Sequence, residues 1–144
     1  MKKSLIWCLL AIVLVAGVLV YFAPMKLTKV VTEEKDMRMI LNVFRIENGE
    51  PEIEVVEYQE ITVEQKREVL AVLEEYSYRR TLETVVSDGT MEDMGEKMLT
   101  VHVMGENTAE SVVLTSSGKI SVNGRVYWMK GAGEMMEEIL GIVG

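Results

Sequence analysis

The residues best suited to bind a ligand lie between Met91 and Met104. Four of them offer soft or nitrogen ligands, namely Met91, Met94, Met98 and His102, the only histidine in the chain. Thioether and imidazole groups suit ions such as Cu(I) or Ag(I). Methionine is also a flexible filler of apolar cores. The segment is therefore a candidate metal or small-ligand site, with core packing as the competing interpretation.

Carboxylates in the same region could instead hold a hard cation such as Ca²⁺. They are Asp88, Glu92, Asp93 and Glu96. Their spacing does not follow the EF-hand loop, and acidic turns are common on solvated surfaces. We therefore expect a solvated loop and assign no metal and no cofactor.

The sequence marks no catalytic residues. A lone histidine cannot form a two-histidine metal site, and no serine lies in a G-x-S-x-G elbow. Glu52, Glu54 and Glu57 lie on a predicted strand, where they form its solvated side. A hydrolase whose site the sequence does not reveal stays open as an alternative.

The candidates for contact with another molecule are two arginines and two aromatic residues. A guanidinium group can form two parallel hydrogen bonds with a carboxylate, so Arg79 and Arg80 suit an acidic partner. The alternative is that they stabilise the C-terminal end of a preceding helix. Tyr127 and Trp128 are adjacent on a predicted strand and face opposite sides. One ring is then an exposed anchor for a partner, or both rings close the core.

Composition limits the chain to one compact domain. It has 144 residues, of which 49% are hydrophobic, so a folded core is expected. From Lys26 onward, 13 Lys and Arg residues stand against 23 Asp and Glu residues, which leaves a formal charge of −10. Such a surface repels phosphates, so nucleic acid is excluded as a partner and anionic lipid is disfavoured.

An apolar run of 19 residues, Leu5–Ala23, follows Lys2 and Lys3. As a helix it would be about 28 Å long, which matches the hydrocarbon core of a bilayer. The alternative is a cleaved signal peptide. Cleavage after Ala23 would place Tyr21 where a small residue is needed, so we expect a retained signal-anchor within residues 1–25.

The sidedness of this anchor is inferred from the layout of the N-terminus. Four cations follow the apolar run and only two precede it, so the Lys and Arg count does not favour a cytoplasmic N-terminus. A very short basic head before an apolar run is nevertheless the signal-anchor layout, which exports the chain on its C-terminal side. We therefore expect a single-pass protein of the cell membrane with its C-terminal domain extracytoplasmic.

The remaining chain alternates strand and turn patterns. Residues 26–36 are polar and predict a short stalk. Period-two alternation over residues 37–44 predicts a strand, which the turn at Asn48-Gly49 joins to Ile53–Tyr58. Further strands are predicted at Leu82–Val86, Lys97–Met104, Ser111–Thr115, Ile120–Val122 and Arg125–Met129, the last two joined by Asn123-Gly124.

Two amphipathic helices complete the predicted fold. Thr62 and Gln65 have the spacing of a capping box before an apolar stripe that runs to Tyr76. Glu134–Val143 forms a second stripe at the end of the chain. We therefore predict an α+β fold, in which residues 37–144 form one domain with a mostly antiparallel sheet packed against two helices.

The layout resembles uncharacterised small membrane-anchored extracytoplasmic α+β proteins of Gram-positive bacteria. The resemblance lies in the anchor, the stalk, the capped segment ITVEQKREVLAVLEEYSYRR and the closing segment ISVNGRVYWMKGAGEMMEEIL. It implies location and fold class only. We expect a membrane-tethered accessory module that binds a protein or another envelope component without performing chemistry. The alternative is a metal or small-ligand sensor that uses Met91–Met104.

Overall fold

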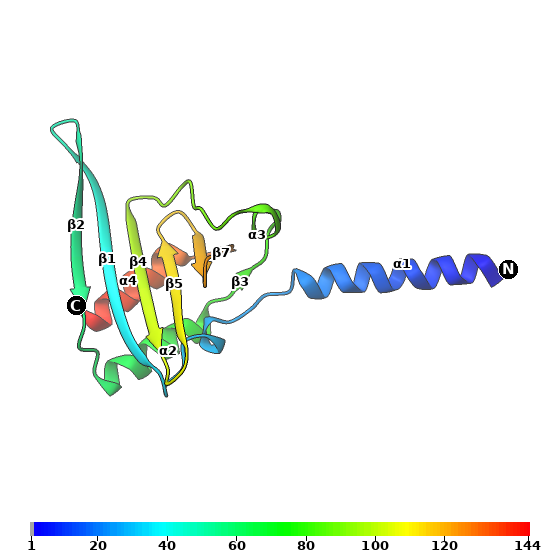
Figure 1. Ribbon diagram of the computed structural model, residues 1–144, viewed down its shortest axis with the longest axis horizontal. Coiled ribbons are helices and arrows are strands. Elements are labelled where there is room, and N and C mark those ends of the chain that lie inside the picture. Colours follow the sequence, from blue (N-terminus) through cyan, green and yellow to red (C-terminus); the bar gives the residue numbers. More distant parts are fainter. Residues whose placement is uncertain (1) are drawn as a thin grey trace.

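A single helix projects from the body of the protein (Figure 1). The computed structural model describes residues 2–144, with side chains from Ser4 onward, so the side chains of Lys2 and Lys3 lie outside the described part. Helix α1 (Lys2–Tyr21) contains a stretch, Ser4–Tyr21, that is long and apolar enough to cross a membrane, and none of it is buried. A helix that is apolar on all sides and unburied is typical of a membrane span.

The rest of the chain forms an antiparallel sheet with seven strands in the order β2-β1-β4-β5-β6-β7-β3. The strands are β1 (Asp36–Glu47), β2 (Glu50–Tyr58), β3 (Tyr78–Arg79), β4 (Lys97–Met104), β5 (Ala109–Thr115), β6 (Lys119–Val122) and β7 (Arg125–Met129). The other elements are the 3₁₀ turn η1 (Leu27–Lys29) and the helices α2 (Val63–Glu75), α3 (Leu82–Val86) and α4 (Ala132–Val143). The predicted α+β fold is confirmed.

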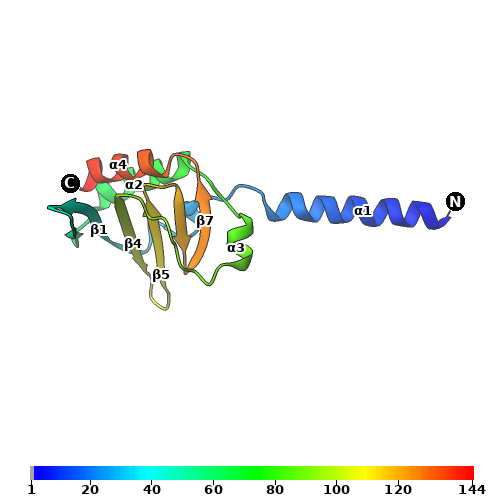
Figure 2. The same cartoon turned by 90° about the horizontal axis from the view of Figure 1, so that it is seen from above.

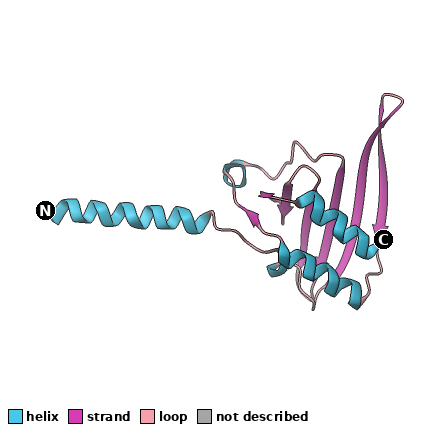
Figure 3. Ribbon diagram, turned by 180° about the vertical axis from the view of Figure 1, so that it is seen from behind, coloured by secondary structure: helices cyan, strands magenta, loops and turns pink. Residues whose placement is uncertain are grey.

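Helices α2 and α4 lie side by side on one face of the sheet (Figures 2 and 3). Alternate strand residues point toward them and are buried, including Met39 of β1, Leu99 of β4 and Leu114 of β5. The apolar stripe of α4 supplies Met135 and Ile139, both fully buried. The core therefore lies between this face and the two helices, and we call the opposite side of the sheet the open face.

The predicted hairpin turns and the predicted helix cap are confirmed. Asn48 and Asn123 have φ angles of 54° and 49°, and the glycine after each has a positive φ, as two-residue type I′ turns require. At the start of α2, the Thr62 hydroxyl accepts from the Gln65 N–H at 3.2 Å, and Gln65 Oε1 accepts from the Thr62 N–H at 3.0 Å. The two turns and the helix cap each depend on residues that are neighbours in the sequence, so tertiary packing does not alter them.

The strand predicted at Leu82–Val86 is wrong, because this segment is helix α3. Its β-branched residues mimic a strand, but the segment pairs with no strand among residues 2–144. Local hydrogen bonds bend it instead: the Thr81 N–H donates to Thr84 Oγ1 at 2.9 Å, and the Ser87 N–H donates to the Glu83 carbonyl at 2.8 Å. The chain has to leave the sheet here, because it runs from β3 at one edge to β4 in the centre.

Residues 26–36, expected to form a stalk, contribute to the core instead. Leu27 and Val31 are each only 1% exposed. Just before them, Met25 and Tyr78 exchange two main-chain hydrogen bonds of 2.8 and 3.0 Å. The polar composition of the segment obscures the two apolar residues Leu27 and Val31, which lie four positions apart. The Val31 N–H donates to the Leu27 carbonyl at 2.9 Å, and this turn brings both side chains to the core. The segment is therefore not a free spacer.

Candidate functional site

The open face of the β1–β2 hairpin carries three well-exposed apolar side chains. Phe44 pairs with Ile53 and Asn42 with Val55, so these side chains share one face. Ile46, Ile53 and Val55 are 81%, 57% and 55% exposed. Neither α2 nor α4 covers this face, since both lie on the other side of the sheet (Figure 3). Contiguous exposed apolar side chains of this kind mark interaction sites.

Part of this surface is hollowed into what we call the apolar groove. Its floor is formed by Phe44, Ile46, Pro51 and Ile53, and Gly95 and Glu96 form one wall. The hollow has a volume of about 680 Å³. The Phe44 N–H donates to the Glu96 carbonyl at 2.8 Å, which fixes the wall against β1. The groove can therefore receive apolar side chains from another molecule.

The wall of the groove is held by contacts that tie residues 83–96 to the open face. Lys119 Nζ and Glu83 Oε1 form an ion pair at 2.9 Å, and the carboxylate raises the pKa of Lys119. Ser117 Oγ donates to the Asp93 carbonyl at 2.7 Å. Ser116 Oγ accepts from the N–H of Glu96 at 2.9 Å. Helix α3 is thus attached to β6 by one contact, and the loop between α3 and β4 is attached to the turn between β5 and β6 by two.

Two glutamates, Glu52 and Glu96, line the apolar groove. The hairpin glutamates Glu47, Glu50 and Glu54 alternate with Ile46, Ile53 and Val55 along the strands, so they belong to the opposite face of the sheet. Arg45 also lines the groove, but its guanidinium forms an ion pair with Glu54 at 3.3 Å. The groove therefore has an apolar floor and an acidic rim, which favours basic groups on whatever binds there.

A second hollow on the open face contains His102. It has a volume of about 320 Å³, and its lining includes Arg38, Ile40, His102, Met104 and Glu57. Arg38 and His102 are opposite each other on β1 and β4. Cationic and acidic side chains share this smaller hollow, so it selects no single ligand charge. It is the weaker candidate for that reason.

The candidate metal ligands are not brought together in this hollow. Of Met91, Met94, Met98 and His102, only His102 lines it. Met98 and His102 share a strand face but are four residues apart, which is about 13 Å along a strand. Among residues 2–144, no group of three or more His, Cys, Asp or Glu side chains is arranged to hold a metal ion.

The four predicted contact residues have different surroundings. Arg80 is not at the end of a helix, because α2 ends at Glu75, and it binds the end of α1 instead. Arg79 is exposed and pairs with Trp128, which is 46% exposed. Tyr127 is buried against Tyr78, with the two rings edge to face and their centroids 5.0 Å apart. Burial raises the pKa of Tyr78. Tyr127 is therefore a core residue, and Trp128 is the exposed ring of the pair.

The sequence does contain a signal for the apolar groove. In the strand over residues 37–44, both alternating sets contain apolar residues, since Ile40 and Phe44 face away from Met39 and Leu41. A sheet face meant only for water would carry polar residues there. Apolar residues on both sides of a strand thus point to a second contact surface.

Comparison of the chain with protein-family models, with curated proteins and with solved structures finds no match.

Proposed function

We propose that this chain is a membrane-tethered extracytoplasmic module that binds another protein through its apolar groove. The observation that carries the proposal is the exposure of Ile46, Ile53 and Val55 beside this groove. Burying such side chains against a partner removes apolar surface from water, which is the main favourable term in protein association. No chemical step is required of the module.

The rim of the groove defines the kind of partner. Carboxylates at Glu52 and Glu96 line the groove, and the guanidinium of Arg45, which also lines it, forms an ion pair with Glu54. A segment with apolar side chains flanked by lysine or arginine would satisfy both the floor and the rim. We therefore propose an apolar and basic segment of another envelope protein as the partner.

The tether supports this role. Helix α1 is long and apolar enough to cross a membrane. Confinement to a thin layer beside the bilayer raises the effective concentration of the domain toward other membrane proteins, so a weak contact is sufficient. The groove lies on the β1–β2 hairpin, at the edge of the sheet opposite β3, and β3 is the strand next to the anchor (Figure 1).

Photo-crosslinking in intact cells tests the groove. A photoreactive phenylalanine analogue replaces Ile53 in one variant and Val63 of α2 in a matched control, because these side chains are 57% and 54% exposed. We expect a crosslinked protein adduct from position 53 and none from position 63. The adduct should decrease at 1 M salt, where the Debye length falls to about 3 Å. Equal adducts from both positions, or none from position 53, would contradict the proposal.

The sidedness is tested separately by labelling a new cysteine. Cys8 is the only native cysteine, so Glu106→Cys in a Cys8→Ser background gives one exposed thiol in the turn between β4 and β5. A membrane-impermeant maleimide should label this thiol in whole cells. Labelling that requires lysis would place the domain in the cytoplasm.

A further inference from the structure

Helix α3 exposes its apolar side chains and turns its polar ones inward. Leu82, Val85 and Val86 are 77%, 58% and 80% exposed. The two polar residues of the helix are half-buried: Glu83 forms an ion pair with Lys119 at 2.9 Å, and Thr84 accepts a hydrogen bond from the Thr81 N–H. This arrangement is the reverse of that expected for a helix facing water.

Helix α3 lies at the end of the domain that carries α1, as two views of the molecule agree (Figures 1 and 2). Leu82 follows Arg80 by two residues. Arg80 Nη1 in turn donates a hydrogen bond of 2.8 Å to the carbonyl of Tyr21, the last residue of α1. The exposed apolar side chains therefore begin within a few residues of a direct contact with the anchor.

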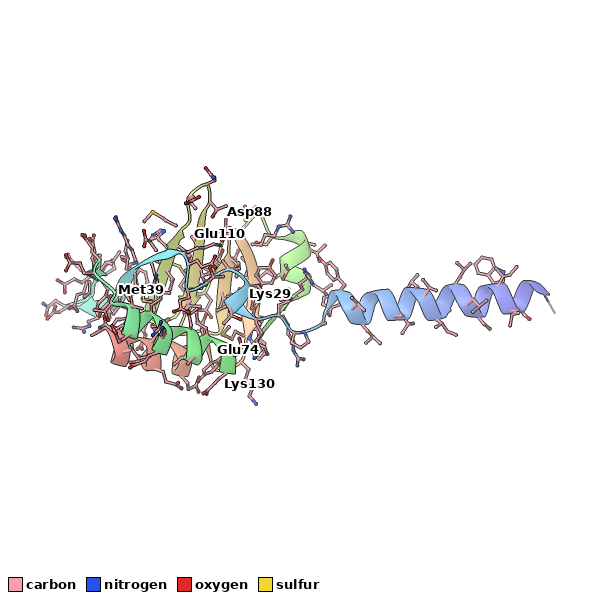
Figure 4. All side chains as sticks on the ribbon, turned by 90° about the horizontal axis from the view of Figure 1, so that it is seen from below. Lys29, Met39, Glu74, Asp88, Glu110 and Lys130 are labelled. Carbon is pink, nitrogen blue, oxygen red and sulfur yellow. The ribbon has the colours of Figure 1, made fainter. Side chains whose placement is uncertain are left out.

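The charge near the anchor differs from that of the domain as a whole. Residues 22–32 and 76–82 contain Lys26, Lys29, Arg79 and Arg80 and no Asp or Glu. Figure 4 shows Lys29, Lys130 and the carboxylates Glu74 and Asp88 at the end of the domain nearer α1, whereas Met39 lies toward the other end. These two segments are therefore basic, but carboxylates lie at the same end of the domain, so the exposed apolar side chains of α3 and not its charge surroundings carry the inference.

We propose that α3 is a second membrane contact, whose apolar side chains enter the boundary between the headgroups and acyl chains of the bilayer that α1 crosses. The proposal rests on the anchor assigned under the proposed function. Apolar side chains gain by leaving water at this boundary, and the covalent tether makes even a weak insertion effective. If all three side chains faced water instead, no transfer into lipid would offset the cost of exposing them.

Docking of α3 would fix the orientation of the sheet. It holds the β3 edge at the membrane surface, because β3 precedes α3 directly and is bridged to the segment after α1. Six strand spacings of about 4.8 Å then place β2 about 29 Å farther along the sheet. The apolar groove would be presented away from the lipid, where a partner can reach it.

Spin labels on the full chain test this orientation. In a Cys8→Ser background, a nitroxide is attached at Val86→Cys or, as a matched control, at Ile46→Cys, since the native side chains are 80% and 81% exposed. The protein is reconstituted in vesicles of phosphatidylcholine and phosphatidylglycerol. Collision rates with oxygen, which partitions into lipid, and with a water-soluble nickel chelate give a depth parameter. We expect this parameter to be positive at position 86 and negative at position 46.

A third label at Leu14→Cys, within α1, separates the two proposals. A lipid signal at position 14 with an aqueous signal at position 86 would overturn the docking of α3 and leave the anchor intact. An aqueous signal at position 14 would overturn both. A label at position 86 shielded from oxygen and nickel alike would indicate a protein occupant and would also overturn the docking of α3. Unchanged thermal midpoints of the labelled variants would show that the fold is retained.

Discussion

The guanidinium of Arg80 caps the C-terminal end of α1. Its Nη1 atom donates to the Tyr21 carbonyl at 2.8 Å, and its Cζ atom lies 4.7 Å from the centre of the Tyr21 ring. The last carbonyls of a helix have no donor within the helix and carry the negative end of its dipole, so a cation is favoured there. The apolar helix is therefore joined to the domain by a side-chain contact as well as by the chain.

Replacing Arg80 with leucine should loosen this junction. The hydrogen bond and the cation–π contact together contribute about 1 kcal/mol at a partly exposed site, so local opening should increase about fivefold. Chymotrypsin cleavage after Phe22, in detergent, measures this opening. Arg79→Leu is the control, because the Arg79 side chain is exposed and has no described hydrogen bond or ion pair. Equal cleavage rates in the two variants would contradict the assignment.

Leu27→Ala should destabilise the whole domain. Leu27 is 1% exposed, and removal of a buried leucine side chain costs about 2–4 kcal/mol through lost burial and the cavity left behind. The free energy of unfolding in urea, followed by the near-UV signal of the core tyrosines, measures the effect. Lys29→Ala in the same turn should change stability by no more than about 0.5 kcal/mol. A free stalk would tolerate both substitutions equally.

The sequence predicted the elements whose signals are local. The capping box at Thr62 and the Asn-Gly turns each involve neighbouring residues, and the structure places all of them as expected. Long alternating segments such as Lys97–Met104 were predicted with the observed bounds. In these cases the local preference and the tertiary contacts agree, so the pattern alone is sufficient.

The features that were missed depend on contacts between distant residues. The two-residue strand β3 forms only because Tyr78 meets both Met129 and Met25, and no pattern of that length is readable in a sequence. Likewise, α3 has strand-like residues but pairs with no strand among residues 2–144. The apolar groove depends on which sheet face the helices cover, and the periodicity of a strand does not specify that side.

The contact candidates show the same limit. Adjacent positions on a strand face opposite sides, so the sequence required Tyr127 and Trp128 to differ in environment. The sequence could not show which of the two side chains is buried, because that depends on Tyr78, from another part of the chain, packing against Tyr127. The role of Arg80 was also inaccessible, since its partner Tyr21 is 59 residues away.

Alkaline pH should remove one contact between α2 and α4. The Tyr76 hydroxyl donates to Glu138 Oε1 at 2.7 Å, and this bond raises the pKa of Tyr76 from 10.0 to about 12. A raised pKa means that the stabilising effect is complete below pH 10 and is lost as the pH approaches 12, where the phenolate would repel the carboxylate. Tyr76→Phe should therefore cost at most about 1 kcal/mol near neutral pH.

Urea unfolding of the wild type and Tyr76→Phe at several pH values measures this contribution. The difference in unfolding free energy between the two proteins should be constant below pH 10 and disappear by about pH 12. Taking the difference cancels the titration of the other tyrosines and of the lysines. A difference that persists unchanged at the highest pH would show that the hydroxyl acts by packing alone.

Acid should weaken the contact between β5 and the segment that precedes β1. Lys35 Nζ donates to Glu110 Oε2, and Asn123 Nδ2 donates to Glu110 Oε1 at 3.3 Å. The Lys35 bond is the main cause of a lowered pKa at Glu110. A lowered pKa means that the stabilisation is present above the ordinary carboxyl pKa of 4.5 and is lost as the pH falls through the lowered value.

Glu110→Gln should therefore reduce the unfolding free energy by about 1 kcal/mol at pH 7, the size expected for a partly exposed pair. The deficit should shrink as the pH falls below 4.5 and the wild-type carboxylate gains its proton. Glu106→Gln is the control, because Glu106 is exposed near the same end of β5 and has no described partner. Urea unfolding at a series of acidic pH values checks both variants. If the deficit of Glu110→Gln does not depend on pH, the amide disturbs packing and the ion pair contributes nothing measurable.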